Sequence, residues 1–247
     1  MTELPQYETF DERTQTLTVR SPETAVVLLS GGLDSTVLTT MLVRAYGPEN
    51  VRALNILYGQ RHSEAESMAA ELVAGKLGVK LEVIDLESAL RAVFDGSGSA
   101  LVNRGVPVPD GHYEAPTMKS TVVPNRNMLM LSVATARAIV LKATVVAYAA
   151  HAGDHSIYPD CRPEFVTQLR QTIDLCDDSP PMLFAPFLHV SKGAIVTEGV
   201  KLGAPFHLSY SCYKGGARHC GTCGTCTERK QAFALAGVRD PTEYKVP

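Results

Sequence analysis

The sequence predicts an α/β fold, in which a doubly wound parallel sheet is followed by a small C-terminal metal-binding subdomain. Three observations predict this fold. An apolar run at 25–29 ends in Ser-Gly-Gly-Leu-Asp-Ser, strand and helix patterns alternate after it, and four cysteines crowd near the C-terminus. Strands that alternate with helices form parallel sheets, because each right-handed crossover returns the chain to the same edge.

The bulk composition restricts the class of protein. The chain has 247 residues, of which 45% are hydrophobic, and this is enough for one large domain with an appendage. Its net charge of −3 gives no support for direct nucleic-acid binding, and no apolar run is long enough to cross a membrane. Residues 1–22 are polar and acidic, unlike a secretory signal, so we expect a cytoplasmic protein.

The first half of the chain is expected to form three strands and two helices. Residues 25–29 suit a strand that is buried on both faces, and apolar residues recur at helical spacing over 34–46. Strand patterns follow at 51–57 and 80–84, on either side of a helix over 63–77.

A long segment without periodicity separates the two halves of the sheet. Residues 95–118 are rich in Gly, Pro and Asp, and a stretch of this length is a functional loop or lid, or is disordered. The pattern resumes with a helix over 127–141 and a strand over 144–149. Helices over 163–175 and 191–202 complete the main domain, and the first of them begins at a proline.

These patterns divide the chain into three parts. Residues 1–22 form a polar N-terminal segment, in which 16–19 could add one short edge strand. Residues 23–205 form the α/β domain. Residues 206–247 form the metal-binding segment, with a closing helix over 230–236.

The cysteines near the C-terminus have the spacing of metal ligands. Cys212, Cys220, Cys223 and Cys226 read C-x7-C-x2-C-x2-C, and the short gaps let neighbouring thiolates converge on one ion. Four thiolates suit tetrahedral Zn²⁺ in a closed structural site. An iron–sulfur cluster is the main alternative, and a disulfide pair is the next. Outside this cluster, Cys176 is expected to be a small buried core residue.

The turn after the first strand has the features of an anion site. Gly31 and Gly32 let the backbone turn sharply and approach a ligand, and the helix that follows presents free N–H groups at its positive end. The turn is neither a Walker A loop nor a nucleophile elbow, because it lacks both signatures. The alternative is an ordinary strand–turn–helix connection with a serine cap.

Five features together resemble the 7-cyano-7-deazaguanine synthase (QueC) family. They are Ser-Gly-Gly-Leu-Asp-Ser at 30–35, Tyr-Gly-Gln-Arg-His at 58–62, Val-Val-Pro-Asn-Arg-Asn at 122–127, Tyr-Pro-Asp-Cys-Arg-Pro-Glu-Phe at 158–165, and the four cysteines. The first of them is similar to the PP-loop of ATP pyrophosphatases, which hold the pyrophosphate of ATP and release AMP. The resemblance implies a PP-loop, adenine nucleotide alpha hydrolase-like fold over nearly the whole chain.

The resemblance also implies an activity and its partners. Family members convert 7-carboxy-7-deazaguanine and ammonia to 7-cyano-7-deazaguanine, a precursor in queuosine biosynthesis. The reaction consumes ATP and passes through an adenylated acid and an amide. We therefore expect ATP, Mg²⁺ and one structural Zn²⁺ per chain, a homodimer, small-molecule substrates, and neither a nucleic acid nor a membrane as a partner.

The expected nucleotide site follows from the PP-loop and the neighbouring strand ends. It comprises Leu28, Leu29, Ser30, Gly31, Gly32, Leu33, Asp34, Ser35, Thr36, Val37, Asn55 and Gln60. Among the site residues, Ser30, Asp34, Ser35 and Arg126 are expected to be catalytic. Asp34 could instead help to place Mg²⁺, or could only supply charge to the first turn of the helix.

The expected substrate site lies in the loops after the strands. It comprises Arg61, His62, Asn125, Arg126, Asp154, Asp160 and Arg162. The Arg126 fork suits a phosphate or a carboxylate, and one acid can accept both hydrogen bonds from a guanine edge. Asn125 could instead be a helix cap, and His62 could be an ordinary loop histidine. Lys119 and Lys192 could supply phosphate charge, with a solvated surface lysine as the alternative for each.

Three other functions remain compatible with these motifs. A paralogue with the same activation chemistry could stop at the amide, or could join the deazaguanine carboxylate to another amine, including one on a protein. A tRNA-modifying PP-loop enzyme fits less well, because the chain is acidic and its only Cys-x2-Cys spacings lie in the cysteine cluster. A nucleotide-binding module without catalytic activity is the third.

Overall fold

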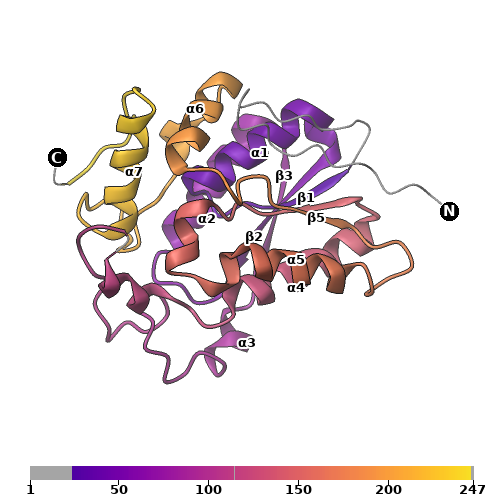
Figure 1. The fold of residues 1–247 in the computed structure, drawn as a ribbon, viewed down its shortest axis with the longest axis horizontal. Helices are drawn as coiled ribbons and strands as arrows, with labels where there is room; N and C mark the ends of the chain where they lie inside the picture. The colour runs from indigo at the N-terminus through magenta and orange to yellow at the C-terminus, as the bar shows by residue number, and fades with distance from the viewer. Residues whose placement is uncertain (1–23, 114, 246–247) are drawn as a thin grey trace.

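Figure 1 shows the computed structural model of this protein, which describes residues 24–113 and 115–245. The predicted N-terminal segment 1–22, with its edge strand at 16–19, lies outside the described residues. At the other end of the chain, the described residues stop two short of the C-terminus.

A five-stranded parallel sheet forms the centre of the fold. Its strands are β1 (Ala25–Leu28), β2 (Val51–Leu57), β3 (Lys80–Asp85), β4 (Val145–Ala147) and β5 (Met182–Phe184). Their order across the sheet is β3-β2-β1-β4-β5, and every neighbouring pair is parallel. The doubly wound parallel sheet is therefore confirmed. β5 was not predicted, because its three residues directly follow a proline pair and are too few to show a period.

The described chain has seven α-helices, of which the last two follow β5. They are α1 (Leu33–Tyr46), α2 (Ser63–Leu77), α3 (Glu87–Arg91), α4 (Arg126–Leu141), α5 (Pro163–Ile173), α6 (Lys192–Leu202) and α7 (Gly224–Leu235). Of the helices that were predicted, all but the last differ from their predicted bounds by two residues or fewer. The closing helix was wrong at its start, because α7 begins six residues before the predicted 230. Glycine, threonine and cysteine form helices poorly by themselves, and here the cysteine cluster determines where the helix begins.

Helices cover both faces of the sheet. In Figure 1, α1 and α6 lie on one side of the strands, and α4 and α5 lie on the other. Alternate residues of β1 point to the two sides, so Val27 packs with α1 and α6 whereas Val26 packs with α4 and α5. Both valines have no exposed surface, as expected for a parallel strand between two helical layers.

The described part of the segment 95–118 is packed against the domain. The Arg61 guanidinium donates from Nη2 to the carbonyl oxygens of Asn103 (3.0 Å) and Val106 (2.9 Å). Farther along, the Gly111 N–H donates to the carbonyl oxygen of Thr222, beside the cysteines (2.9 Å). This segment thus links the carboxyl end of β2 to the C-terminal segment.

A buried arginine holds the C-terminal segment together. Arg229, on α7, has no exposed surface, and its Nε lies 3.2 Å from Oδ1 of Asp240. The guanidinium also donates to the Ser209 hydroxyl (2.8 Å) and to the carbonyl oxygen of Phe206 (3.1 Å). These bonds satisfy a charge that would be costly to bury alone.

Candidate functional site

The glycine turn after β1 lies directly on α2. Gly31 has a φ of 83°, and a Cβ at this position would lie 2.7 Å from the amide nitrogen of Ala70 and 2.7 Å from the carbonyl oxygen of Glu66. Only glycine meets both demands, because other residues rarely adopt this φ and all of them carry a Cβ. The close approach fixes where the loop turns and where α1 begins.

The N-terminus of α1 is free to bind an anion. Its N-cap is Gly32, so no side chain occupies the first N–H groups of the helix. The hydroxyls of Ser30 and Ser35 lie 3.1 Å apart beside them, and the Ser35 hydroxyl donates to the carbonyl oxygen of Gly32 (3.2 Å). Two hydroxyls and the positive helix end together suit a phosphate group.

The loop opens into a cavity at the carboxyl ends of β1, β2 and β4. Open α/β sheets bind ligands at this edge, where the strand order reverses. Here it reverses between β1 and β4, because the chain continues from β1 to β2 on one side and from β4 to β5 on the other. Nine of the twelve expected nucleotide residues line the cavity: Leu28, Leu29, Ser30, Gly32, Leu33, Asp34, Ser35, Asn55 and Gln60. The other three, Gly31, Thr36 and Val37, are buried behind the loop and do not line it.

A cluster of charged groups borders the cavity beside the glycine loop. The Lys192 ammonium group lies 3.1 Å from Oδ2 of Asp34 and 2.5 Å from Oε2 of Glu228. Burial alone would lower the pKa of Lys192, but these carboxylates raise it above its usual value. Burial raises the pKa of Glu228. Lys192 is not a solvated surface lysine, so that alternative was wrong: only 14% of its side chain is exposed. Lys119, for which the same alternative was given, is exposed.

His151 joins this cluster to the loop that follows β4. Its Nδ1 accepts the Gly153 N–H (3.0 Å), which places the ring proton on Nε2. That nitrogen lies 3.5 Å from Oδ1 of Asp154, and the same oxygen accepts the Tyr113 hydroxyl (2.8 Å). Burial would raise the pKa of Asp154, but His151 and Lys192 hold it below its usual value. Tyr113 brings the segment 95–118 into the cavity wall.

Another wall of the cavity is aromatic and surrounds one arginine. The Arg126 guanidinium carbon lies 5.5 Å from the centre of the Tyr158 ring and interacts with the Tyr58 hydroxyl. The Tyr158 hydroxyl is 3.4 Å from that of Tyr213 and 2.8 Å from the Thr121 hydroxyl, and these contacts fix its ring. Burial raises the pKa of Tyr58 to about 12, so its phenol stays neutral.

A histidine–glutamate pair completes this wall at the first turn of α2. The His62 Nε2 lies 3.4 Å from one Glu66 oxygen, and the Gln60 side chain donates to the other (3.0 Å). His62 also packs against the Tyr213 ring, with their centroids 5.2 Å apart. It is buried and lines the cavity, so it is not an ordinary exposed loop histidine.

Of the seven predicted substrate residues, three line the cavity: His62, Arg126 and Asp154. Arg61 does not, because its guanidinium is bound to the segment 95–118. Arg162 donates from Nε to the carbonyl oxygen of His155 on the exposed side of its loop (2.9 Å).

The other two predicted substrate residues lie at the start of α4, outside the cavity lining. Asn125 occupies the N-cap position of α4, as the helix-cap alternative predicted, but it is exposed and its side chain caps no N–H group. The Asp160 carboxylate provides that cap instead, by accepting the Asn127 N–H (2.9 Å). Neither Asn125 nor Asp160 therefore lines the cavity.

Three functional residues were not predicted: Tyr113 and Glu66 line the cavity, and Glu228 contacts Lys192 without lining it. Each lies in a segment that shows no catalytic motif in the sequence. The available signal for Glu228 was its place two residues after Cys226, since a helix that begins at the cysteines carries it toward Lys192.

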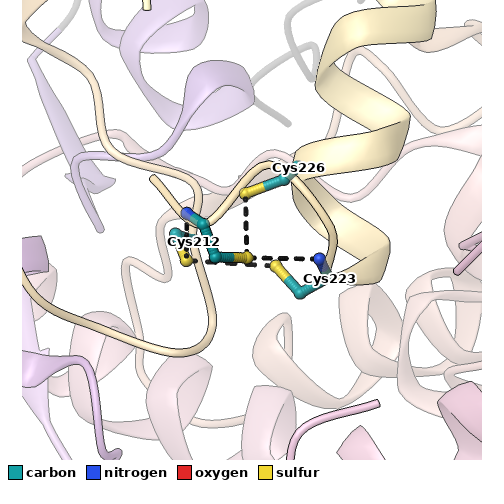
Figure 2. Close-up of side chains that lie close together, drawn as sticks. Cys212, Cys223 and Cys226 are labelled. Atoms are coloured by element: carbon teal, nitrogen blue, oxygen red, sulfur yellow. Dashed lines mark hydrogen bonds between the residues drawn. The ribbon is translucent and has the colours of Figure 1, made fainter. Parts of the chain in front are cut away.

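The four cysteines converge as expected for one metal ion. Their sulfur atoms all lie within 4.8 Å of one another, and Figure 2 shows Cys212, Cys223 and Cys226 pointing toward a common centre. The Cys220–Cys226 and Cys223–Cys212 sulfur pairs are 3.8 Å and 4.0 Å apart. A tetrahedral ion with bonds of about 2.3 Å requires sulfur separations of about 3.8 Å, so the residues fit one ion.

The donors around the sulfurs also fit bound thiolates. The backbone N–H groups of Thr222 and Cys223 point to Cys220 Sγ, at 3.4 and 3.2 Å. These contacts stabilise negative charge on sulfur. Cys176 lies outside the cluster and is exposed, so the expectation that it is buried was wrong: it follows the last turn of α5, beyond the core side of that helix.

No helix among the described residues has the length and apolar character needed to cross a membrane.

Comparison with known proteins yields one family model over almost the whole chain. The model described as "Queuosine biosynthesis protein QueC" matches residues 24–237. The 7-cyano-7-deazaguanine synthase of Allorhizobium ampelinum is 50% identical over 90% of this chain and 92% of its own length. That of Caldicellulosiruptor saccharolyticus is 47% identical over 90% of this chain and 96% of its own.

A solved structure shares the fold at much lower sequence identity. The U34-tRNA thiolase NcsA of Methanococcus maripaludis, with its [4Fe-4S] cluster, superposes with a TM-score of 0.51 at 12% identity. The match covers 92% of this chain and 68% of that one. At this identity the likeness concerns the fold alone.

Proposed function

Because the chain belongs to the QueC family of queuosine biosynthesis proteins, we propose that it is a 7-cyano-7-deazaguanine synthase. In this proposal the enzyme uses ATP and ammonia to convert 7-carboxy-7-deazaguanine to 7-cyano-7-deazaguanine. The relatives that carry this name are about half identical to it over nine tenths of its length.

The observation that carries the proposal is the joining of two kinds of surface in one cavity. A free helix N-terminus with two serine hydroxyls lies on one side, and an aromatic wall with a partly buried arginine and a buried histidine lies on the other. The first suits the phosphates of ATP, and the second suits a flat, charged heterocycle. A phosphate-binding fold alone would not need the second surface.

The chemistry follows from the poor leaving group of a carboxylate. A carboxylate oxygen of the substrate attacks the α-phosphorus of ATP, and pyrophosphate leaves. Ammonia adds to the activated carbonyl, and AMP leaves to give the amide, with one proton lost. The amide oxygen then attacks a second ATP in the same way, and loss of AMP and of both amide protons gives the nitrile.

The residues of the glycine loop would act on the phosphates. The N–H groups of α1 and the hydroxyls of Ser30 and Ser35 would bind the pyrophosphate as it departs. Asp34 keeps Oδ1 buried without a partner among the described residues, so that oxygen is available to a Mg²⁺ ion carried by ATP. Lys192 would neutralise Asp34 until the nucleotide arrives.

We assign the cysteine site to Zn²⁺. The sulfur separations fit one ion, whereas a cluster of several irons binds each thiolate to a different iron and spreads the sulfurs farther apart. Four ligands leave no open position, so the ion would stabilise the fold and supply no catalytic chemistry. The C-terminal zinc segment, the homodimer and the cytoplasmic location also belong to this proposal.

Mass spectrometry of the products tests the proposal. The purified protein would be incubated with ATP, Mg²⁺, ammonium and 7-carboxy-7-deazaguanine, and the nitrile and AMP are the expected products. Amide as the final product, or AMP without nitrile, would contradict the proposal and favour the paralogue that stops early or uses another amine. Protein labelled with deazaguanine in the same sample would identify a protein amine as the acceptor.

A further inference from the structure

The cavity contains one arginine whose charge the fold does not neutralise. Arg126 begins α4 and lines the cavity. Among the residues that the structure describes, no carboxylate forms an ion pair with it. Its Nε donates a long hydrogen bond to the Asn127 side chain (3.4 Å), and no carbonyl or carboxylate of those residues accepts from its terminal nitrogens.

The groups that surround Arg126 are neutral or already engaged. Burial raises the pKa of Tyr58 and of Tyr158, so neither phenol supplies a negative charge at neutral pH. The nearby Glu66 carboxylate is held by His62 and Gln60 instead. The Asp160 carboxylate caps α4. Arg126 is partly buried, and a ligand that supplies an anion relieves the cost of holding its charge there.

The shape of the surroundings indicates the kind of anion. Tyr158 lies against the guanidinium, and Tyr58 and Tyr213 extend the aromatic surface on the same cavity. Flat aromatic ligands pack against such rings. The planar guanidinium group of arginine can bind a carboxylate through two parallel hydrogen bonds. The phosphate-binding features lie elsewhere, at the N-terminus of α1.

We propose that Arg126 binds the free carboxylate of the deazaguanine substrate and so distinguishes the acid from the amide that is formed later. This inference rests on the proposed function. In the first half of the reaction the carboxylate carries a negative charge, whereas the amide that enters the second half is neutral. Arg126 therefore contributes to recognition of the first substrate and little to recognition of the second.

The half-reactions provide the test. Nitrile formation would be measured by mass spectrometry with saturating ATP, starting either from 7-carboxy-7-deazaguanine or from its synthetic amide. In Arg126→Gln, kcat/KM for the acid should fall by about 100-fold or more, since a charged partner is lost, and kcat/KM for the amide should fall by less than about 10-fold. Arg91→Gln is the matched control, because Arg91 is exposed on α3.

Equal losses for acid and amide would overturn the assignment, because Arg126 would then act on the phosphates common to both halves. No loss with either substrate would overturn it as well. A wild-type enzyme that converts neither substrate would overturn the proposed function itself, and this result differs from a variant that loses one half-reaction.

Thermal melting provides a readout that does not depend on turnover. If Arg126 is an unneutralised charge in the free enzyme, Arg126→Gln should melt at the wild-type temperature or above it. Melting well below wild type would overturn the inference, because Arg126 would then be satisfied within the fold.

Discussion

The ammonium group of Lys192 lies 3.1 Å from Oδ2 of Asp34, so the first residue of α6 contacts the first turn of α1. These residues are far apart in the sequence and meet at the carboxyl edge of the sheet. Lys192 also reaches Glu228 on α7, and one cation thus joins three elements around the cavity.

Asp34→Asn should lower AMP formation by at least about 100-fold while the fold remains intact, because the charge beside the phosphates is lost. Liquid chromatography of AMP measures the rate, and circular dichroism checks the fold. Asp178→Asn is the matched control, since Asp178 is exposed, does not line the cavity, and precedes the amino end of β5. Full turnover by Asp34→Asn would refute a catalytic role for the loop.

Lys192→Met should lower both activity and stability. The substitution leaves Asp34 and Glu228 facing each other without a cation, and removing one partner of a buried pair costs about 3–5 kcal/mol. Urea unfolding would show this loss in the midpoint at an unchanged slope. Lys76→Met, on the exposed side of α2, should leave the midpoint unchanged. An unaltered midpoint for Lys192→Met would contradict the cluster as described.

Cys223→Ser should release the metal and lower the melting temperature. A closed four-thiolate site contributes its binding free energy to folding, and this is about 10–16 kcal/mol for structural zinc in peptides. Elemental analysis and calorimetry measure the two effects. Cys176→Ser is the control, because Cys176 is an exposed thiol outside the cluster. Unchanged metal content in Cys223→Ser would rule out the proposed ligand set.

The Glu82–Arg137 pair between β3 and α4 should give a pH-dependent contribution to stability. Hydrogen bonds from Arg137, at 2.6 and 2.9 Å, lower the pKa of Glu82 below its usual 4.5. A lowered pKa in the folded state means that the contribution is present above about pH 4.5 and is lost as the pH falls through the folded-state pKa.

Glu82→Gln should therefore destabilise the protein by about 1 kcal/mol at neutral pH, since the pair is partly exposed. Denaturant titrations at several pH values would measure the difference. It should shrink in acid, and a difference that stays constant down to pH values well below 4.5 would contradict the assignment. The exposed Glu87–Arg91 pair provides a comparison, and Glu87→Gln should have less effect at any pH.

The fold was predictable because periodicity is a local property of the chain. β2 and α2 have the bounds that their patterns predicted. β5 and the start of α7 were not predictable by the same means. The three residues of β5 show no period, and α7 begins where the cysteine cluster places it.

The candidate site was predictable only in part, because contacts across the fold determine it. The glycine loop and the cysteine spacing are local motifs, and the structure places both as expected. Arg61 and Arg126 could not be told apart from the sequence, since each stands just before a predicted helix. Only the fold shows that Arg61 bonds to backbone carbonyls and that Arg126 faces the cavity. Glu228 meets Lys192 through tertiary packing that no local pattern encodes.

The contact of Gly31 with α2 has a genetic consequence. Every missense change of a glycine codon adds a Cβ, and at this position that atom would collide with the backbone of α2, 2.7 Å from two of its atoms. Gly75 is itself a residue of that helix, yet a Cβ there meets nothing within 4 Å. In a saturation library selected for function, codon 31 should therefore remain glycine, whereas codon 75 should accept alanine and serine freely.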